Sequence, residues 1–206
     1  TVRLRGGTHN PFAPSATFLQ HMETMFGGYS LELIRHGFYP AGGGEMHVRI
    51  ASAATKIGAP RFTERGELVK AWAKCLHAGV PRGVAERELQ TLGRALGWGE
   101  SQLLNRGLRS HEGPGNALQA ILQYENCTEV CTALGKKGVT AEKVAEQLAD
   151  AVRAYQAHDA PVGEYLADQL LIPMALAHWQ GNGEGTFYAT KITEHTRTNA
   201  RIIAQF

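Results

Sequence analysis

The sequence predicts an α+β fold, in which helices pack against the faces of β-sheets. Segments with strand-like residue patterns alternate with segments in which apolar residues recur at helical spacing. The first quarter of the chain has the order strand, helix, strand, strand, and the middle contains a strand pair followed by an amphipathic helix. Because such strands and helices each have one apolar side, helices layered on sheets bury both.

The composition is that of a globular protein with a sizeable core. Of the 206 residues, 43% are hydrophobic and 19% are charged, so one or two domains are expected. The 21 basic and 19 acidic residues give a net charge of +2, which permits a polyanionic partner but does not indicate one. We find no apolar run long enough to span a bilayer and no basic-then-apolar leader, so we expect a cytoplasmic protein without a membrane partner.

In the N-terminal part, residues 1–5 are strand-like, and a helix is expected over residues 15–26. The apolar side of this helix comprises Phe18, Leu19, Met22 and Met25. Two further strands, 29–34 and 46–50, flank a turn over residues 36–45 that contains Gly42-Gly43-Gly44. Glycine supplies positive φ in many ordinary turns, so on its own this turn favours a structural role.

The middle of the chain, from residue 63, is expected to form a small α/β module with its own core. Residues 67–78 are strand-like, and Pro81 opens a helix. Residues 117–124 and 128–134 predict a strand pair, after which Thr140 caps a second helix. The two helices have apolar stripes formed by Ala85, Leu89, Leu92 and Leu96 and by Val144, Leu148, Val152 and Tyr155.

In the C-terminal part, residues 166–176 predict a helix that is buried on most sides. A strand over residues 186–192 then leads into a helix from about Thr196. This arrangement repeats the loop-into-helix pattern of the N-terminal part, with a Thr/His/Asn cluster at the start of the helix in both places.

His195 lies at the predicted junction between strand and helix. Unpaired N–H groups and the positive end of the helix dipole favour an anion at such a position. The same dipole disfavours imidazolium, so an uncharged imidazole here is suited to attack phosphorus. The alternative is that His195 is only a polar neighbour of the helix cap, as histidines at helix starts often are.

Tyr165, Asp168 and Gln169 have the spacing i, i+3 and i+4, which places them on one face of a helix that is otherwise aliphatic. One interpretation is a hydrogen-bond network at the start of the helix. The other is a nucleotide pocket, in which the ring stacks on a base and the carboxylate and the amide bind its edge or the ribose.

Four segments, in this order, resemble the RNA 3'-terminal phosphate cyclase family over nearly the whole chain: residues 5–11, 36–45, 163–170 and 194–199. The resemblance implies partial βαβαββ-type repeats at residues 1–62 and 158–206, interrupted by a small α/β (thioredoxin-like) module at residues 63–157. It also implies that an N-terminal portion and the closing strands of the last repeat lie outside this chain.

The resemblance further implies ATP-dependent conversion of an RNA 3'-phosphate end to a 2',3'-cyclic phosphodiester, with release of AMP and pyrophosphate. His195 then corresponds to the histidine that becomes adenylylated. The residues implied in ATP binding are Tyr165, Leu166, Ala167, Asp168 and Gln169, with Pro14 and Phe18 as the opposite wall of an adenine slot. We expect Arg3, Arg5, Arg35, His36, Arg197 and Arg201 to be candidates for phosphate contacts.

Such chemistry needs a divalent metal, Mg²⁺ or Mn²⁺, but no carboxylate cluster in the sequence indicates a site for it, so its main ligand is expected outside this chain. The three cysteines lack zinc-site spacing and are expected to be reduced thiols. Two alternatives remain at this point: a non-catalytic cyclase-like protein that acts as a binding component in ribosome assembly, and a transferase of related repeat architecture. The sequence does not indicate the oligomeric state.

Overall fold

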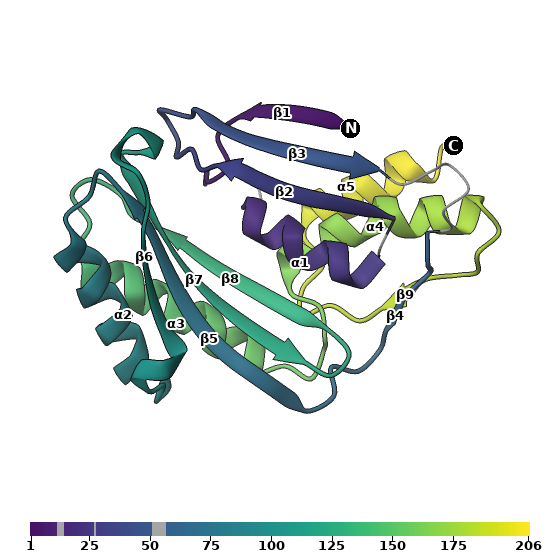
Figure 1. Ribbon diagram of the computed structural model, residues 1–206. Coiled ribbons are helices and arrows are strands. Elements are labelled where there is room, and N and C mark those ends of the chain that lie inside the picture. The colour runs from purple at the N-terminus through teal and green to yellow at the C-terminus, as the bar shows by residue number, and fades with distance from the viewer. Residues whose placement is uncertain (12–14, 27, 51–56) are drawn as a thin grey trace.

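The computed structural model describes residues 1–11, 15–26, 28–50 and 57–206, and in it helices and sheets alternate in layers (Figure 1). A three-stranded sheet lies on top, helix α1 (Ala16–Phe26) lies below it, and a four-stranded sheet lies below α1. Helices α2 (Arg82–Leu96) and α3 (Ala141–Gln156) cover the lower side of the four-stranded sheet. The predicted mixture of helix and sheet is therefore confirmed as α+β.

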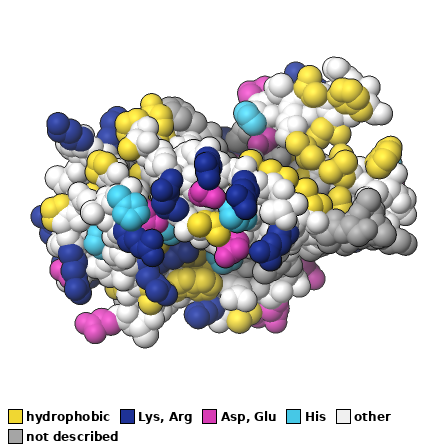
Figure 2. All heavy atoms as spheres, turned by 45° about the horizontal axis from the view of Figure 1, so that its top comes forward, with side chains coloured by type: hydrophobic (Ala, Val, Ile, Leu, Met, Phe, Trp, Pro, Cys, Tyr) yellow, Lys and Arg dark blue, Asp and Glu magenta, His cyan; other side chains and the backbone are white. Residues whose placement is uncertain are grey.

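The upper sheet is antiparallel and has the strand order β1 (Val2–Gly6), β3 (Gly44–Ile50), β2 (Tyr29–Arg35). These strands and α1 agree with the predicted elements. The outer face of the sheet carries interspersed charges of both signs, which Figure 2 shows as Lys and Arg side chains gathered around carboxylates and histidines. Glu45 accepts from Arg5 Nε at 3.2 Å and lies 2.8 Å from His47 Nε2, so part of this basic charge is already neutralised.

The lower sheet has the order β6 (Leu103–Gly107), β5 (Leu68–Ala78), β7 (Gly115–Tyr124), β8 (Thr128–Leu134). Strand β5 runs parallel to β6 and antiparallel to β7, which in turn is antiparallel to β8. Two short 3₁₀ helices, η1 (Glu100–Gln102) and η2 (Ser110–Glu112), flank β6. The sequence did not predict β6, because its central residues are half polar and it is an edge strand.

One continuous hydrophobic core joins both sides of the lower sheet. Phe18 and Met22 of α1 belong to the same cluster of buried side chains as Ile121 of β7 and Leu148 of α3. Leu166, from the C-terminal part, belongs to it as well. The buried side chains of residues 63–157 thus belong to a cluster that they share with α1 and α4, and the division into repeats and an inserted module with its own core stays a prediction.

The C-terminal part comprises α4 (Glu164–Trp179), β9 (Thr186–Phe187) and α5 (Glu194–Ile203), with β9 pairing in parallel with β4 (Arg61–Phe62). Helix α4 is not buried on most sides as predicted: Leu166, Leu170 and Met174 form one buried stripe, while Ile172 and Leu176 are about half exposed. Strand β9 is shorter than predicted, since beyond it the only pairing among the described residues is an isolated bridge at Ala189.

Helix α5 begins two residues earlier than predicted. Thr193 is its N-cap, and the Thr193 hydroxyl accepts the Thr196 N–H at 3.1 Å, so Glu194 and His195 form the first turn. No helix of the described residues is long and apolar enough to cross a membrane.

The glycine corner, which we define as residues 36–45, is shaped by close packing. A Cβ at Gly37 would collide with the backbone of Gly42 and Gly44, and a Cβ at Gly44 would collide with the Thr8 methyl group. Thr8 Oγ1 accepts the Gly37 N–H at 2.9 Å, and Phe38 packs on the end of the lower sheet. The corner thus joins β2, β3 and the loop after β1 to the lower sheet.

Candidate functional site

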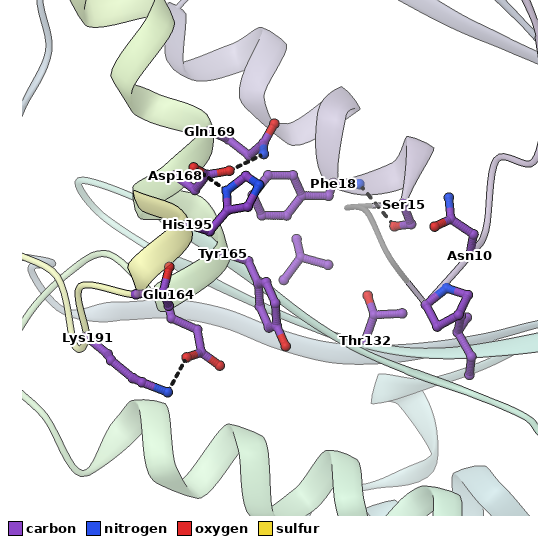
Figure 3. A pocket seen from close by; sticks show the side chains of 14 residues that line it. Asn10, Ser15, Phe18, Thr132, Glu164, Tyr165, Asp168, Gln169, Lys191 and His195 are labelled. Carbon is purple, nitrogen blue, oxygen red and sulfur yellow. Dashed lines mark hydrogen bonds and ion pairs between the residues drawn. The ribbon is translucent and has the colours of Figure 1, made fainter. Parts of the chain in front are cut away.

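A cavity of about 910 Å³ opens between β8, the N-terminal end of α1, and the first turns of α4 and α5 (Figure 3). This volume suits a nucleotide-sized ligand. Its walls are formed by Asn10, Pro11, Ser15, Phe18, Val130, Thr132, Leu134, Glu164, Tyr165, Asp168, Gln169, Lys191, Thr193 and His195.

The α4 wall contains the three side chains predicted to share a helix face. Tyr165, in the first turn, is 67% exposed, so its ring is available to a ligand. Asp168 and Gln169 follow one turn later, and Gln169 Nε2 donates to Asp168 Oδ2 at 3.1 Å. The structure therefore places all three on the cavity, as helical spacing requires.

His195, in the first turn of α5, points at Asp168. Its Nδ1 lies 2.9 Å from Asp168 Oδ1, and its side chain is 81% exposed while that of Asp168 is 13% exposed. Asn199, one turn further along α5, donates from Nδ2 to the same Asp168 oxygen at 3.2 Å. A mostly buried carboxylate is thus in contact with the imidazole, an amide from α5 and an amide from α4.

This geometry fixes which nitrogen of His195 can act on a ligand. When Nδ1–H donates to Asp168, Nε2 carries the lone pair, and the exposed ring leaves that nitrogen accessible. A carboxylate behind an imidazole also stabilises the positive charge that develops when Nε2 forms a bond. The pair has the arrangement of a nucleophile with an orienting partner.

The opposite wall is formed by α1 and β8. Phe18 lines the cavity, although most of its ring is in the core and it is only 4% exposed. Ser15 anchors the start of α1, because Gln119 Nε2 of β7 donates to Ser15 Oγ at 2.7 Å. Pro14, the other predicted member of this wall, lies outside the described residues.

Leu166 and Ala167 do not line the cavity with their side chains. Both are 0% exposed and belong to the hydrophobic core. The reason is helical geometry: positions i+1 and i+2 after Tyr165 turn away from the face that carries Tyr165 and Asp168. Their part in the site is to hold α4 against the sheet.

The sequence analysis assigned no site role to six polar residues that line the cavity: Asn10, Ser15, Thr132, Glu164, Lys191 and Thr193. Asn10 follows the loop after β1, Thr132 lies on β8, and Lys191 Nζ pairs with Glu164 Oε2 at 3.1 Å. Thr132 had a sequence signal, since Val130, Thr132 and Leu134 alternate along one face of a predicted strand. Asn10 and Glu164 lie in segments 5–11 and 163–170, which carry the family resemblance. Lys191 and Asn10 reach the cavity through loop geometry that spacing does not encode.

Neither a metal site nor a cluster of basic residues forms part of the described cavity. Within the described ranges, no group of three or more His, Cys, Asp or Glu side chains could hold a metal ion. The predicted phosphate-binding arginines are not among the residues that line the described cavity, and Arg197 pairs with Glu194 at 3.4 Å. All three cysteines are free thiols in the structure, and burial raises the pKa of each.

The fold and the cavity define an α+β protein with a candidate nucleotide site built around an exposed histidine that is paired with a mostly buried carboxylate. The model of the family "RNA 3'-terminal phosphate cyclase" matches residues 1–206. The chain belongs to the RNA 3'-terminal phosphate cyclase family.

Curated bacterial relatives are similar along the entire chain. The RNA 3'-terminal phosphate cyclase of Koribacter versatilis (strain Ellin345) is 43% identical over 210 residues, which cover 100% of this chain and 58% of the relative. Those of Pseudomonas aeruginosa (strain UCBPP-PA14) and Salmonella enteritidis PT4 (strain P125109) are each 40% identical and are each covered to 60%. The chain therefore spans about 60% of the length of these relatives.

Proposed function

We propose that this chain carries the nucleotidyl-transfer centre of an RNA 3'-terminal phosphate cyclase. The substrates are ATP and an RNA with a 3'-phosphate end, and the products are a 2',3'-cyclic phosphodiester, AMP and pyrophosphate. Family membership supports this reaction. The single observation that carries it is the exposed His195 imidazole, backed by Asp168 at 2.9 Å and lining one cavity with Tyr165.

In the first step, the Nε2 lone pair of His195 attacks the α-phosphorus of ATP. An N–P bond forms, the bond from the α-phosphorus to the bridging oxygen breaks, and pyrophosphate leaves with that electron pair. The imidazole gains positive charge, which Asp168 offsets through the Nδ1–H hydrogen bond. The product is a histidyl-AMP phosphoramidate.

Asp168 itself is held in place by its neighbours. The Asn199 amide and the Gln169 amide donate to its two oxygens, so the carboxylate keeps one rotamer facing α5. This arrangement maintains the Nδ1–H tautomer of His195, which the reaction needs because only Nε2 is open to the cavity.

In the second step, an oxygen of the RNA 3'-phosphate attacks the phosphorus of the phosphoramidate, and His195 Nε2 takes back the electron pair. The resulting RNA-adenylate is an anhydride, so AMP is a good leaving group. In the third step, the adjacent 2'-hydroxyl oxygen attacks the terminal RNA phosphorus, its proton is lost to solvent, and AMP departs.

The nucleotide base would lie in the part of the cavity between Tyr165 and Phe18. Tyr165 offers an exposed ring at one side, and Phe18 closes the apolar floor. We retain Pro14 as a proposed second wall. The described residues supply no metal site, so no step is assigned to Mg²⁺ or Mn²⁺ here.

The experiment that tests this function is covalent labelling of the complete gene product, numbered as in this chain, with α-labelled ATP and magnesium. The wild type should acquire acid-labile, alkali-stable label, and His195→Ala should lose it. His178→Ala, which removes an exposed histidine from the far end of α4, is the matched control and should label normally. A wild type without label would favour the non-catalytic cyclase-like binding component instead.

A further inference from the structure

Glu129 is a deeply buried carboxylate that the reaction described above does not use. It lies on β8 and is only 3% exposed. Its neighbours on β8, Val130 and Thr132, line the cavity, whereas Glu129 belongs to the other pleat of the strand and pairs across the ladder with Leu122.

Glu129 contacts the segment between α3 and α4, where the chain passes around the edge of the lower sheet. Strand β8 is an edge strand, and the chain leaves α3 on one side of it and enters α4 on the other. At that crossing, Glu129 Oε2 accepts the N–H of Gly163 at 2.9 Å, and Gly163 is the N-cap of α4.

This contact takes the place of the side-chain capping bond that α4 lacks. Gly163 offers no side chain, and α4 has no side-chain capping bond. A glutamate that accepts the N–H of the N-cap residue does what the third helical residue does in a capping box, here from a different strand. The space is matched to it, because a Cβ on Gly163 would come within 2.7 Å of the Glu129 carboxyl group.

Other buried contacts hold the same crossing but carry no charge. The Tyr155 hydroxyl donates to the Pro161 carbonyl at 2.7 Å, and Cys127 Sγ donates to it at 3.3 Å. Val162 N–H donates to the Tyr188 carbonyl at 3.2 Å. Residues 161–163 are thus fixed one after another, and Glu129 fixes the last of them before the helix starts.

Placing a carboxylate here has an energetic cost. Burial raises the pKa of Glu129 to about 7 and Glu164 adds to the rise, while the N–H groups of Gly163 and Val130 and the Arg65 guanidinium oppose it. The buried Cys127 and Tyr155 and the partly buried Cys131 are also close enough to interact with it. A buried ionisable group that costs stability points to a role in geometry.

We propose that Glu129 is a positioning residue for the nucleotide site: by holding Gly163 it sets the first turn of α4, and with it Tyr165 and Asp168, in the arrangement that ATP requires. This inference rests on the proposed function. It joins β8, the wall of the cavity, to the helix that carries the catalytic partner of His195.

The test measures ATP binding to the complete gene product by calorimetry. Glu129→Ala should weaken ATP binding by about tenfold, the scale of losing one hydrogen bond to a charged group. Glu129→Gln keeps an acceptor and should stay within about threefold of wild type. Glu88→Ala is the control, since Glu88 is equally buried but bonds Cys75 and Asn116 far from α4; it should bind ATP normally.

A second readout is amide hydrogen exchange at residues 163–167, which should quicken in Glu129→Ala and not in Glu88→Ala.

Normal ATP binding by Glu129→Ala overturns the proposal, as does an equal loss of ATP binding in Glu88→Ala, which would indicate general destabilisation. Should Glu129→Ala fail to fold, Gly163→Ala displaces the carboxylate instead, and normal ATP binding by that variant would overturn the proposal. A wild type that binds no ATP overturns the proposed function as well, which separates the two failures.

Discussion

The loop that packs on the glycine corner and the candidate nucleotide site each contain a histidine, His9 and His195, and the structure gives the two side chains opposite environments. In the loop that packs on the corner, His9 is 1% exposed and stacks 4.9 Å from Phe38. In the site, the His195 side chain is 81% exposed and touches a carboxylate. The same residue type is sealed in one region and presented to solvent in the other.

The two environments make opposite demands on charge. Burial, with His36 and Lys74 nearby, lowers the pKa of His9 to about 3, so His9 stays neutral and inert in the packing. His195 has Asp168 at hydrogen-bond distance and an open second nitrogen. The comparison teaches that an unusual sequence motif such as the glycine corner can reflect tight packing alone. Exposure beside a charged partner is what distinguishes a candidate catalytic histidine from a histidine of the core.

The largest expected effect is on the site. Asp168→Asn should slow adenylylation of His195 by about 1000-fold, because an amide no longer holds the Nδ1–H tautomer or offsets the imidazolium charge. Quench-flow labelling with α-labelled ATP measures the rate. A loss below about threefold, with the variant folded, would show that the two groups are adjacent without acting together.

A substitution in the corner should act on stability instead. Gly37→Ala should lower the free energy of unfolding by about 3 kcal/mol, because the added Cβ meets the backbone of Gly42 and Gly44. Urea titration measures this loss. At temperatures where the variant is folded, ATP labelling should be unchanged; a stable variant that cannot be labelled would place the corner in the site.

The buried Glu129 predicts a pH dependence of stability. Its folded pKa of about 7 lies above the unfolded value, so it binds more protons when folded, and its contribution to stability is lost as pH rises from about 5 to 8. The loss should be about 2 kcal/mol over that range. Urea titration at each pH gives the free energy of unfolding of the wild type and of Glu129→Gln, and the difference between the two should fall as the pH rises. A difference that does not change with pH contradicts the raised pKa.

The smallest expected effect concerns Asn199. Its amide supports Asp168 from α5 at 3.2 Å, so Asn199→Ala should slow labelling by about tenfold and leave ATP binding unchanged. Asn182→Ala, a change in the loop after α4, is the control. Weakened ATP binding in Asn199→Ala would show that this amide contacts the nucleotide directly.

Periodicity predicted the helices of the middle segment well, because α2 and α3 have unbroken apolar stripes and bury them on one sheet. It overestimated the burial of α4, since Ile172 and Leu176 are apolar but about half exposed. It missed β6, which has no clear alternation. The sequence pattern shows which residues are apolar, whereas the packing of the elements determines which of these residues become buried.

For the site, the sequence placed Tyr165, Asp168 and His195 together through helical spacing and family resemblance. It could not give the contact between Asp168 and His195, because that depends on how α4 and α5 pack. Glu129 was out of reach for the same reason: it is 34 residues from Gly163, and no local rule links them. Leu166 and Ala167 were included because a motif names consecutive residues, whereas a helix shows only some of them to a ligand.

The most direct test of the central claim is to locate the AMP adduct by tandem mass spectrometry after the complete gene product reacts with ATP and magnesium. The account predicts one AMP, bound through nitrogen to His195, and no adduct in His195→Ala. An adduct on another residue, or one that persists in His195→Ala, would contradict the claim that the histidine facing Asp168 is the nucleophile.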